Sequence, residues 1–146
     1  MGMSLIAAPR TAQFPLVAYF GFRFDDTVID VDGNLVDFGA SNLGPTTIVV
    51  APLPPGAMVI GGSISSTQEF DTAALPVTIG DALVPDRYFA ADKKSEGFSP
   101  LVPTGFIGNG ENIEFTFIFD GVATQGAAVI VVEYLVANRA NEVQIA

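Results

Sequence analysis

The sequence predicts an all-β fold: an antiparallel β-sandwich or jelly roll of about eight strands, with one short helix and an extended N-terminal arm. Apolar runs rich in Val, Ile, Phe and Thr alternate with turns rich in Gly, Pro, Asn and Asp. No window has the sustained apolar spacing of an amphipathic helix. The chain has 146 residues, enough for one domain with its own core. We therefore expect a single β-sandwich domain over residues 15–146, preceded by an arm over residues 1–14.

Eight segments show the strand pattern. In chain order they are 16–24, 27–31, 34–38, 46–50, 57–66, 77–79, 112–119 and 127–136. The second and third flank Asp32 and Gly33, a pair that favours a tight hairpin turn. After the fourth segment, three prolines stiffen residues 51–57 and exclude them from a central strand. We expect a corner between two sheets there.

The alternation of side chains assigns faces to two of these segments. Within 57–66, strict alternation puts Met58 and Ile60 on one face and Val59 on the other, while Gly61 and Gly62 mark a bulge or a close backbone approach. Within 112–119, one face carries an isoleucine and three phenylalanines, which we expect to anchor the core. These four residues are Ile113, Phe115, Phe117 and Phe119.

The region 80–112 is the least regular part of the chain. We expect one short helix over 87–96, with Asp86 as its N-cap and Gly97 as its terminator. Half of the basic residues fall here, namely Arg87, Lys93 and Lys94. Two interpretations stay open: a solvated crossover between strands, or a contact patch for an acidic neighbour.

The last strand, 127–136, is apolar on both faces. Its even positions form one core face, and its odd positions include Val129, Val131 and Leu135, with Glu133 as the one charge among them. We favour subunit packing as the cover for the odd face, although a central strand beneath a loop would explain the same pattern. After the strand, residues 138–144 carry Arg139, which either clasps a neighbour through charge-assisted hydrogen bonds or belongs to a solvated terminus.

Charge sets limits on the partners. Sixteen acidic and six basic residues give a net charge of −10, which repels the phosphate backbone of nucleic acid. Charged residues make up only 15% of the chain, against about 25% in an ordinary soluble domain. A neutral soluble monomer is one interpretation, but we favour a protein whose surface is partly covered by other chains.

The residue inventory disfavours catalysis and cofactor binding. The chain has no Cys and no His, which removes the commonest nucleophile, general base and metal ligands. Paired carboxylates such as Asp25 and Asp26 show no sign of a cleft between them. The segment from Asp30 to Asn34 resembles part of a calcium loop, but an EF-hand register would place Val28 at its first position, so a hairpin explains it better. We expect no enzyme activity, cofactor or metal site.

No membrane segment is expected either. The start "MGMSLIAAPRTAQFP" lacks the basic region and the long apolar stretch of a signal peptide. The apolar run near the C-terminus is shorter than the roughly 20 residues that a membrane helix needs. We expect no membrane partner.

Four segments carry a resemblance to a known family. They read "PPGAMVIGGSISSTQEFD", "IGDALVPDRYFAAD", "FSPLVPTGF" and "VVEYLVANRANEVQ", in this order between residues 54 and 144. In combination they resemble small capsid decoration, or cement, proteins of tailed bacteriophages. Residues 1–50 show no such resemblance, and this third could serve a different attachment.

The resemblance implies a β-sandwich or jelly roll bound to the major capsid protein on the outside of a phage head, often as a homotrimer, with no catalytic residues. We expect residues 1–14 to form an arm laid across a neighbouring subunit or the capsid floor. The interface residues expected from the arm, the basic region, the last strand and the tail are Leu5, Ile6, Arg10, Phe14, Arg87, Val131, Leu135 and Arg139.

Two other functions stay open. One is a carbohydrate-binding jelly roll, which would need exposed aromatic side chains, whereas the chain has no Trp and only three Tyr. The other is a structural protein of the tail or of a capsid vertex.

Overall fold

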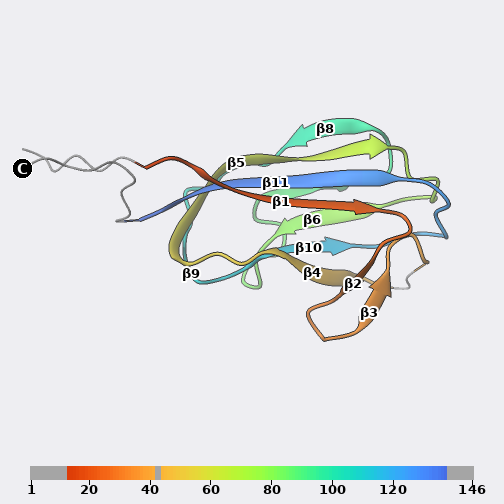
Figure 1. The fold of residues 1–146 in the computed structure, drawn as a ribbon, viewed down its shortest axis with the longest axis horizontal. Coiled ribbons are helices and arrows are strands. Elements are labelled where there is room, and N and C mark those ends of the chain that lie inside the picture. The colour runs from red at the N-terminus through yellow and green to blue at the C-terminus, as the bar shows by residue number, and fades with distance from the viewer. Residues whose placement is uncertain (1–12, 42–43, 138–146) are drawn as a thin grey trace, which may run out of the picture.

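The computed structural model describes residues 13–41 and 44–137, and this part of the chain is all-β (Figure 1). It contains eleven strands and no helix. They are β1 (Leu16–Arg23), β2 (Thr27–Ile29), β3 (Leu35–Asp37), β4 (Thr46–Ala51), β5 (Pro55–Gln68), β6 (Pro76–Gly80), β7 (Phe89–Asp92), β8 (Gly97–Pro100), β9 (Ile107–Asn109), β10 (Ile113–Phe117) and β11 (Ala127–Val136).

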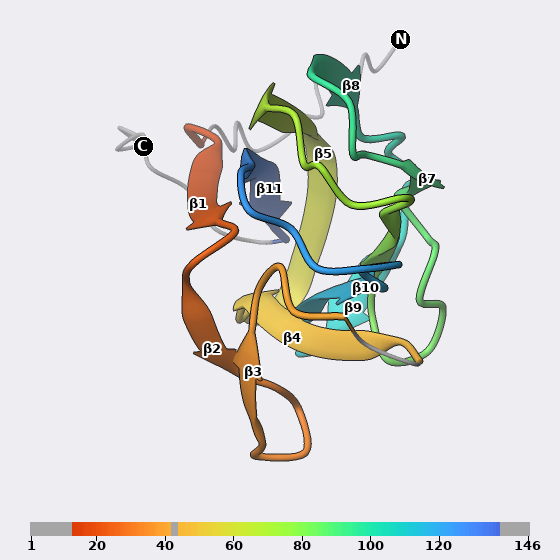
Figure 2. The same ribbon diagram turned by 90° about the vertical axis from the view of Figure 1, so that its right-hand side faces the viewer.

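The strands form two layers and a projecting hairpin. The front sheet, which faces the viewer in Figure 1, has the order β1-β11-β5-β8, and β9 also pairs with β5. The back sheet has the order β4-β10-β6-β7. Every pairing is antiparallel. Figure 2 shows the two layers nearly end on, with the β2–β3 hairpin extending beyond them. The sequence-based expectation of an antiparallel β-sandwich is therefore confirmed.

All eight predicted strands are present, and the last has the predicted bounds. The expected hairpin turn is also present: Gly33 has a φ of 84°, and a carboxylate oxygen of Asp30 accepts hydrogen bonds from the backbone amides of Asp32 and Asn34. The proline-rich corner connects β4 of the back sheet with β5 of the front sheet, as expected. However, β5 begins at Pro55, so the corner is shorter than predicted.

The helix predicted over 87–96 is wrong. In its place β7 pairs with β6, and the amide of Tyr88 donates to the carbonyl of Ile79 at 2.9 Å. The backbone groups that a helix would pair with each other are used between strands instead. Tyr88 is also buried in the core, which an exposed turn of helix would not allow. Gly97 does not end a helix; it begins β8.

A β-bulge in β5 changes the faces predicted for that strand. Glu133 of β11 pairs with Gly61, but the next residue, Tyr134, pairs with Val59, so Ile60 is the extra residue. The bulge lies where the glycine pair indicated it. Because one extra residue reverses the alternation, the strict pattern predicted across 57–66 is wrong. Gly62 has a φ of 133°, and a Cβ there would collide with the backbone carbonyl of Val131, so only glycine fits.

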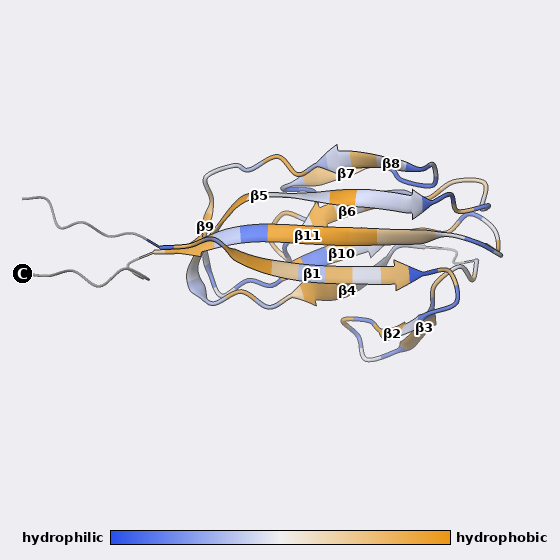
Figure 3. Ribbon diagram, turned by 45° about the horizontal axis from the view of Figure 1, so that its top comes forward, coloured by the Kyte–Doolittle hydropathy of each residue, from blue (hydrophilic) through white to orange (hydrophobic). Residues whose placement is uncertain are grey.

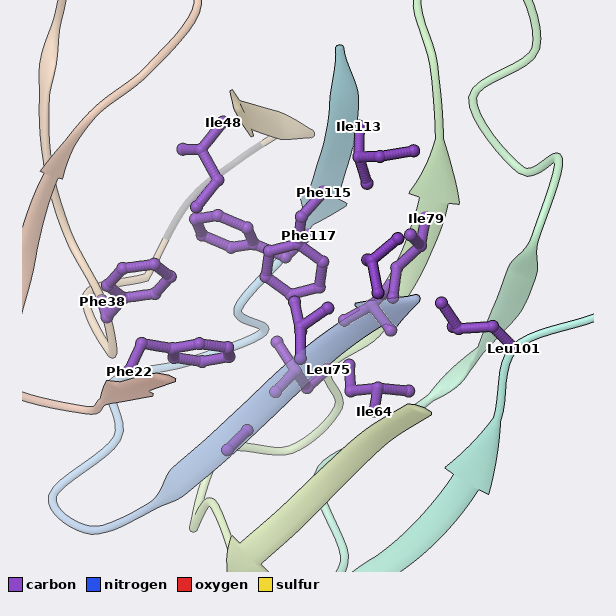
Figure 4. Packing of buried hydrophobic residues seen from close by; sticks show 14 of the residues in the cluster. Phe22, Phe38, Ile48, Ile64, Leu75, Ile79, Leu101, Ile113, Phe115 and Phe117 are labelled. Carbon is purple, nitrogen blue, oxygen red and sulfur yellow. The ribbon is translucent and has the colours of Figure 1, made fainter. Parts of the chain in front are cut away.

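Aromatic rings fill the space between the sheets (Figure 4). The predicted row on β10 and just beyond it is buried, with Phe115, Phe117 and Phe119 each at most 1% exposed. Phe38, which follows the hairpin, stacks on Phe117 at a centroid distance of 5.0 Å and on Phe22 of β1 at 4.5 Å. These ring contacts connect both sheets and the hairpin in one core.

The two ends of the described chain lie at the same end of the sandwich, which we call the terminal end. The side-chain amide of Gln13 donates to the carbonyl of Val136 at 2.7 Å and accepts from its backbone amide at 3.0 Å. This pair of bonds extends the β1–β11 ladder beyond Leu16. The opposite end, which we call the loop end, is where β1 and β5 finish and β11 begins.

Candidate interaction surface

The outward side of the front sheet, which we call the front face, is made of apolar and small side chains. Residues on β11 alternate, so that Ile130 and Val132 are buried inside while their neighbours point outward. The strand pairings place the same face on every other strand of this sheet. The front face consists of Val17, Tyr19, Gly21, Arg23, Met58, Gly61, Ser63, Ser65, Phe98, Pro100, Ile107, Ala127, Val129, Val131, Glu133 and Leu135.

The front face is more apolar than the solvent-exposed face of an ordinary antiparallel sheet. Tyr19 is 69% exposed, Phe98 70% and Val17 62%, and in Figure 3 β11 and β1 carry the hydrophobic colour over much of their length. An antiparallel sheet commonly has one face on the core and one polar face toward solvent. The front sheet lacks that polar face. A contiguous exposed apolar surface of this kind is typical of an interaction site.

Two large side chains of this face lie along the sheet over glycines. Tyr19 lies along its own strand over Gly21, where a Cβ would be 3.3 Å from the tyrosine hydroxyl. Glu133 lies across to β5, and its carboxylate is 3.6 Å from where a Cβ of Gly61 would be. Small side chains thus leave room for large ones to lie down on the sheet. Ser63 and Ser65 keep the middle of the face low.

Charge on this surface is confined to its two ends. Glu133 lies toward the terminal end, paired with Val17, and Arg23 lies at the loop end of β1, paired with Ala127. Among the described residues Glu133 has neither a hydrogen bond nor an ion pair. Arg23 has a distant contact, 3.8 Å from its Nε to an oxygen of Asp25, with both side chains exposed. An exposed pair of this kind contributes little to stability.

The described residues place no segment over the front face, as the unobstructed strands in Figure 1 show. The alternative of a covering loop therefore finds no support in this part of the chain. Both faces of β11 are apolar, although only one of them packs on the protein's own core.

The back sheet presents a different outer surface. Its outward positions include Thr47, Thr78 and Thr116, which lie side by side on three paired strands. The hydroxyls of Thr47 and Thr116 are hydrogen-bonded at 2.8 Å. These hydroxyl groups suit contact with water, although the back sheet also has apolar surface, with Val49 39% exposed and an apolar depression beside Pro76, Ala90 and Ile118.

Arg87, one of the predicted interface residues, has partners within the chain. Its Nε donates to Oδ2 of Asp81 at 2.6 Å and its Nη2 donates to Oδ1 at 3.3 Å, while its guanidinium lies 3.6 Å from the ring centre of Phe106. Burial opposes the ionisation of Asp81, but hydrogen bonds from Arg87, Val84 and Leu83 outweigh it, so the pKa of Asp81 lies below its ordinary value of 3.8. The positive charge of Arg87 is balanced internally, and an interface role for it stays a prediction.

The other predicted interface residues divide into two groups. Val131 and Leu135 lie together on the front face, and Phe14 lies just before β1 with 76% of its side chain exposed. Leu5, Ile6, Arg10 and Arg139 lie outside the described residues, as does most of the expected arm.

The sequence reasoning missed several members of the front face. Val17 and Tyr19 had a readable signal, because the segment "LVAYFGF" is apolar at odd and even positions alike. Phe98 and Ile107 had none, since they belong to short edge strands that no periodicity marks.

The described residues show no constellation suited to catalysis. A hollow beside Asp81, Tyr88 and Glu111 has a volume of about 10 Å³, which holds no more than a water molecule. The larger depressions, of about 340 to 420 Å³, are open to solvent, and the one that contains Asp25 and Asp26 is otherwise lined mainly by apolar side chains. In this part of the chain no three acidic side chains converge as they would around a metal ion, and no helix is present that could cross a membrane. What the geometry offers is a surface for other molecules.

No family model matches the sequence, and no curated protein matches it. Solved structures do match. A chain of the cyanophage Pam1 capsid asymmetric unit is 22% identical with a TM-score of 0.55, covering 90% of this chain and 92% of that one. A chain of the acidic stable capsid of Helicobacter pylori bacteriophage KHP30 is 14% identical with a TM-score of 0.58, covering 84% and 88%. A chain of the Ralstonia phage GP4 capsid is 10% identical with a TM-score of 0.52, covering 94% of each.

These identities are low, and the coverage is high on both sides. The likeness therefore shows a shared fold: the whole described β-sandwich has counterparts among chains of phage capsids.

Proposed function

We propose that the protein is a structural component of a phage virion and that it binds the outer surface of the head as a decoration, or cement, protein. The observation that carries the proposal is the front face: an apolar sheet surface with no cover from the described chain. The likeness to chains of three phage capsids supports the setting, and the four segments that resemble decoration proteins support the role.

The proposed mechanism is the addition of contacts between major capsid proteins. A protein that binds only the assembled shell shifts the equilibrium toward assembly by mass action. When it contacts several shell subunits at once, its later contacts form at a high effective concentration. The protein needs no chemistry for this task, only apolar surface in the right place. The homotrimer implied by the resemblance stays a prediction that a mass measurement of the purified protein tests.

The proposal is tested by binding to shells of the phage that carries the gene, prepared without this protein. We expect the wild-type chain to sediment with these shells at a copy number in the hundreds per particle. Val131→Asp and Leu135→Asp should each reduce binding at least tenfold, because a carboxylate would be buried in the contact. Val49→Asp is the matched control, since Val49 is a partly exposed valine on the back sheet.

Several results would argue against decoration. A wild-type chain that stays in the supernatant contradicts it. A copy number of a dozen or fewer would instead favour the tail or vertex position.

A carbohydrate-binding module is the second candidate, and one observation favours it. Tyr19 and Phe98, both on the front face, are exposed aromatics of the kind that stack on sugars. Selective binding on a glycan array, lost in Tyr19→Ala and Phe98→Ala, would support this function. An array without signal, together with binding to shells, would support decoration.

A further inference from the structure

We infer that the front face packs against the front face of a second copy of this chain, with the strands of the two copies running in opposite directions. The inference does not rest on the proposed function. One face cannot contact the shell and a second copy at the same time, so the pair is the state of the free protein, and binding to the shell replaces it.

The size of the face fits a stable contact between two copies. Four strands at a spacing of about 4.8 Å and ten residues of β11 at about 3.3 Å each define an area of roughly 19 by 33 Å. Two such faces together bury on the order of 1,200 Å², which lies at the lower limit of specific interfaces. Stacking of one sheet on another brings sheets to about 10 Å apart, a distance that side chains of this size can fill.

The charges select the relative direction of the two copies. Acidic side chains crowd at the loop end, where Asp25 and Asp26 follow β1 and Glu69 follows β5. If the strands of the two copies ran in the same direction, these acidic ends would lie together and repel each other. Opposite directions separate the acidic ends.

The same reversal places opposite charges together. Arg23 and Glu133 lie about six residues apart along β1 and β11, or about 20 Å. With the axis across the strands near Ile130, Arg23 of each copy lies over Val17 of the other, one strand away from Glu133, which is within reach of an ion pair. Two equivalent ion pairs result. Parallel strands with the axis along β11 would instead put Glu133 opposite Glu133.

The relief of the face agrees with this arrangement. A shallow depression of about 340 Å³ at the loop end is lined by Tyr19, Arg23, Asp26, Thr67, Ala127 and Val129, among others. The reversal brings the Val131 and Glu133 side of the second copy over this depression. Side chains of one copy can then enter the surface of the other instead of meeting it at a plane.

A twofold contact of this kind joins copies in pairs. A homotrimer would need a different surface for its own contacts, and front-face pairing would then join two trimers into a hexamer. The oligomer that the purified protein forms in solution is therefore expected to contain an even number of copies.

The first experiment exchanges charges and follows the association of the purified full chain by sedimentation equilibrium. Arg23→Glu and Glu133→Arg should each raise the dissociation constant of the pair at least tenfold, and the double variant should return to within about threefold of wild type. Glu114→Arg, on the back sheet, is the control and should change nothing. Circular dichroism and the melting temperature show that each variant is folded. A double variant no tighter than the singles overturns the inference.

The second experiment determines the relative strand direction of the two copies by disulfide cross-linking. Only the introduced cysteines can react, because the chain has none of its own. An equal mixture of Arg23→Cys and Glu133→Cys chains should cross-link one to one on mild oxidation, whereas each variant alone should cross-link little. Cross-linking of either variant alone would indicate parallel strands and overturn the inference, as would a purified protein that is monomeric or trimeric at high concentration.

The two proposals can fail separately. If the chain pairs as inferred but does not sediment with shells, decoration is wrong and the pairing stands. If the chain binds shells and remains monomeric in solution, the pairing is wrong and decoration stands.

Discussion

Two basic residues, Arg87 and Lys93, bind groups of the protein itself instead of extending into solvent. Arg87 is held between Asp81 and Phe106, and Lys93 is only 6% exposed. The ammonium group of Lys93 donates to the carbonyl of Gly97 at 3.0 Å and to the hydroxyl of Ser99 at 3.1 Å. Lys93 follows β7 of the back sheet, and both of its partners lie in β8 of the front sheet. It therefore connects the two sheets along that side.

We predict that Asp81→Asn destabilises the protein by about 3 kcal/mol, because the substitution leaves the guanidinium of Arg87 in a confined place without its carboxylate. Asp81 is 2% exposed, whereas Asp86 in the same loop is exposed, so Asp86→Asn is the matched control. Urea unfolding at pH 7 measures both. Equal stability of the two variants would mean that the pair contributes nothing.

The pair of Asp81 and Arg87 should make the free energy of unfolding depend on pH. The pKa of Asp81 is lower in the folded protein than its ordinary value of 3.8, so its contribution is fully present above that value. The contribution is lost as the pH falls through the folded pKa. Wild type should therefore lose more stability than Asp81→Asn between pH 5 and pH 2. Urea midpoints at several pH values test this, and parallel curves would contradict it.

Lys93 should make the free energy of unfolding depend on pH in the alkaline range. Burial lowers the pKa of Lys93 below its ordinary value of 10.5, so the folded state loses the proton first. Stability should therefore rise with pH in the alkaline range below the ordinary pKa of lysine. Lys93→Met should flatten this rise, while Lys94→Met, a change at a more exposed lysine, should not. The measurement stays below pH 10, because burial raises the pKa of Tyr88 and its ionisation favours unfolding beyond that point.

Among the elements, β5 and β11 form the centre of the front sheet, and a single glycine makes their pairing possible. Gly62 has a positive φ and lies against the carbonyl of Val131, whereas Gly61 has neither restriction. The bulge that these residues form turns Met58 outward and Val59 inward. It thereby decides which side chains reach the front face.

We predict that Gly62→Ala costs about 3 kcal/mol of stability, because alanine would have to hold a conformation that side chains disfavour and would press on the backbone of β11. Gly61→Ala is the matched control one residue away and should cost well below 1 kcal/mol. Thermal unfolding compares the two. A Gly62→Ala protein as stable as the control would show that the bulge relaxes easily.

The sequence contained enough to predict the long strands, because each is either a sustained alternation or a continuous apolar run. β10 is the clearest alternation, since its buried phenylalanines recur at every second position, and β11 is the clearest apolar run. β7, β8 and β9 could not be predicted, since three or four residues hold no measurable period and their pairing is set by neighbours distant in sequence. The false helix has the same origin. Its cap and stop residues are real local signals, but the burial of Tyr88 and the edge of β6 outweigh them.

The candidate site was predictable in part for a related reason. Val131 and Leu135 could be recognised because one strand cannot bury two apolar faces in its own core. The remainder of the front face depends on which strands become neighbours, and that is a property of the topology. Arg87 shows what the sequence did not reveal: the fold supplies Asp81, six residues earlier, as its partner, while its interface role stays a prediction.

At the scale of the whole molecule, the distribution of charge is uneven. The described residues carry fifteen acidic side chains and four basic ones, and two of those four, Arg87 and Lys93, are engaged in the interior. The acidic groups at the loop end lie beyond the strands, so the front face itself is nearly neutral. This separation keeps the apolar surface free of repulsion while the remainder of the protein stays soluble.

Association through the front face should make thermal stability depend on concentration. For a pair that dissociates as it unfolds, a hundredfold increase in protein concentration stabilises each chain by about 1.4 kcal/mol, or about 4 °C in melting temperature. Scanning calorimetry over this range measures it. Val49→Asp should keep the dependence and Val131→Asp should lose it. A wild-type melting temperature that does not change with concentration would contradict association in solution.

The bonds between Gln13 and Val136 have a consequence for protein engineering. They hold the first and last described residues within a few ångströms of each other, so a linker of a few glycines between Gln13 and Ala137 would close the chain into a ring without moving a strand. New ends could then be opened in the solvent-exposed turn at Asp32 and Gly33, which lies outside both sheets. Such a circular permutant would present attached cargo beside the hairpin instead of at the terminal end, and the linker would keep the original ends from fraying.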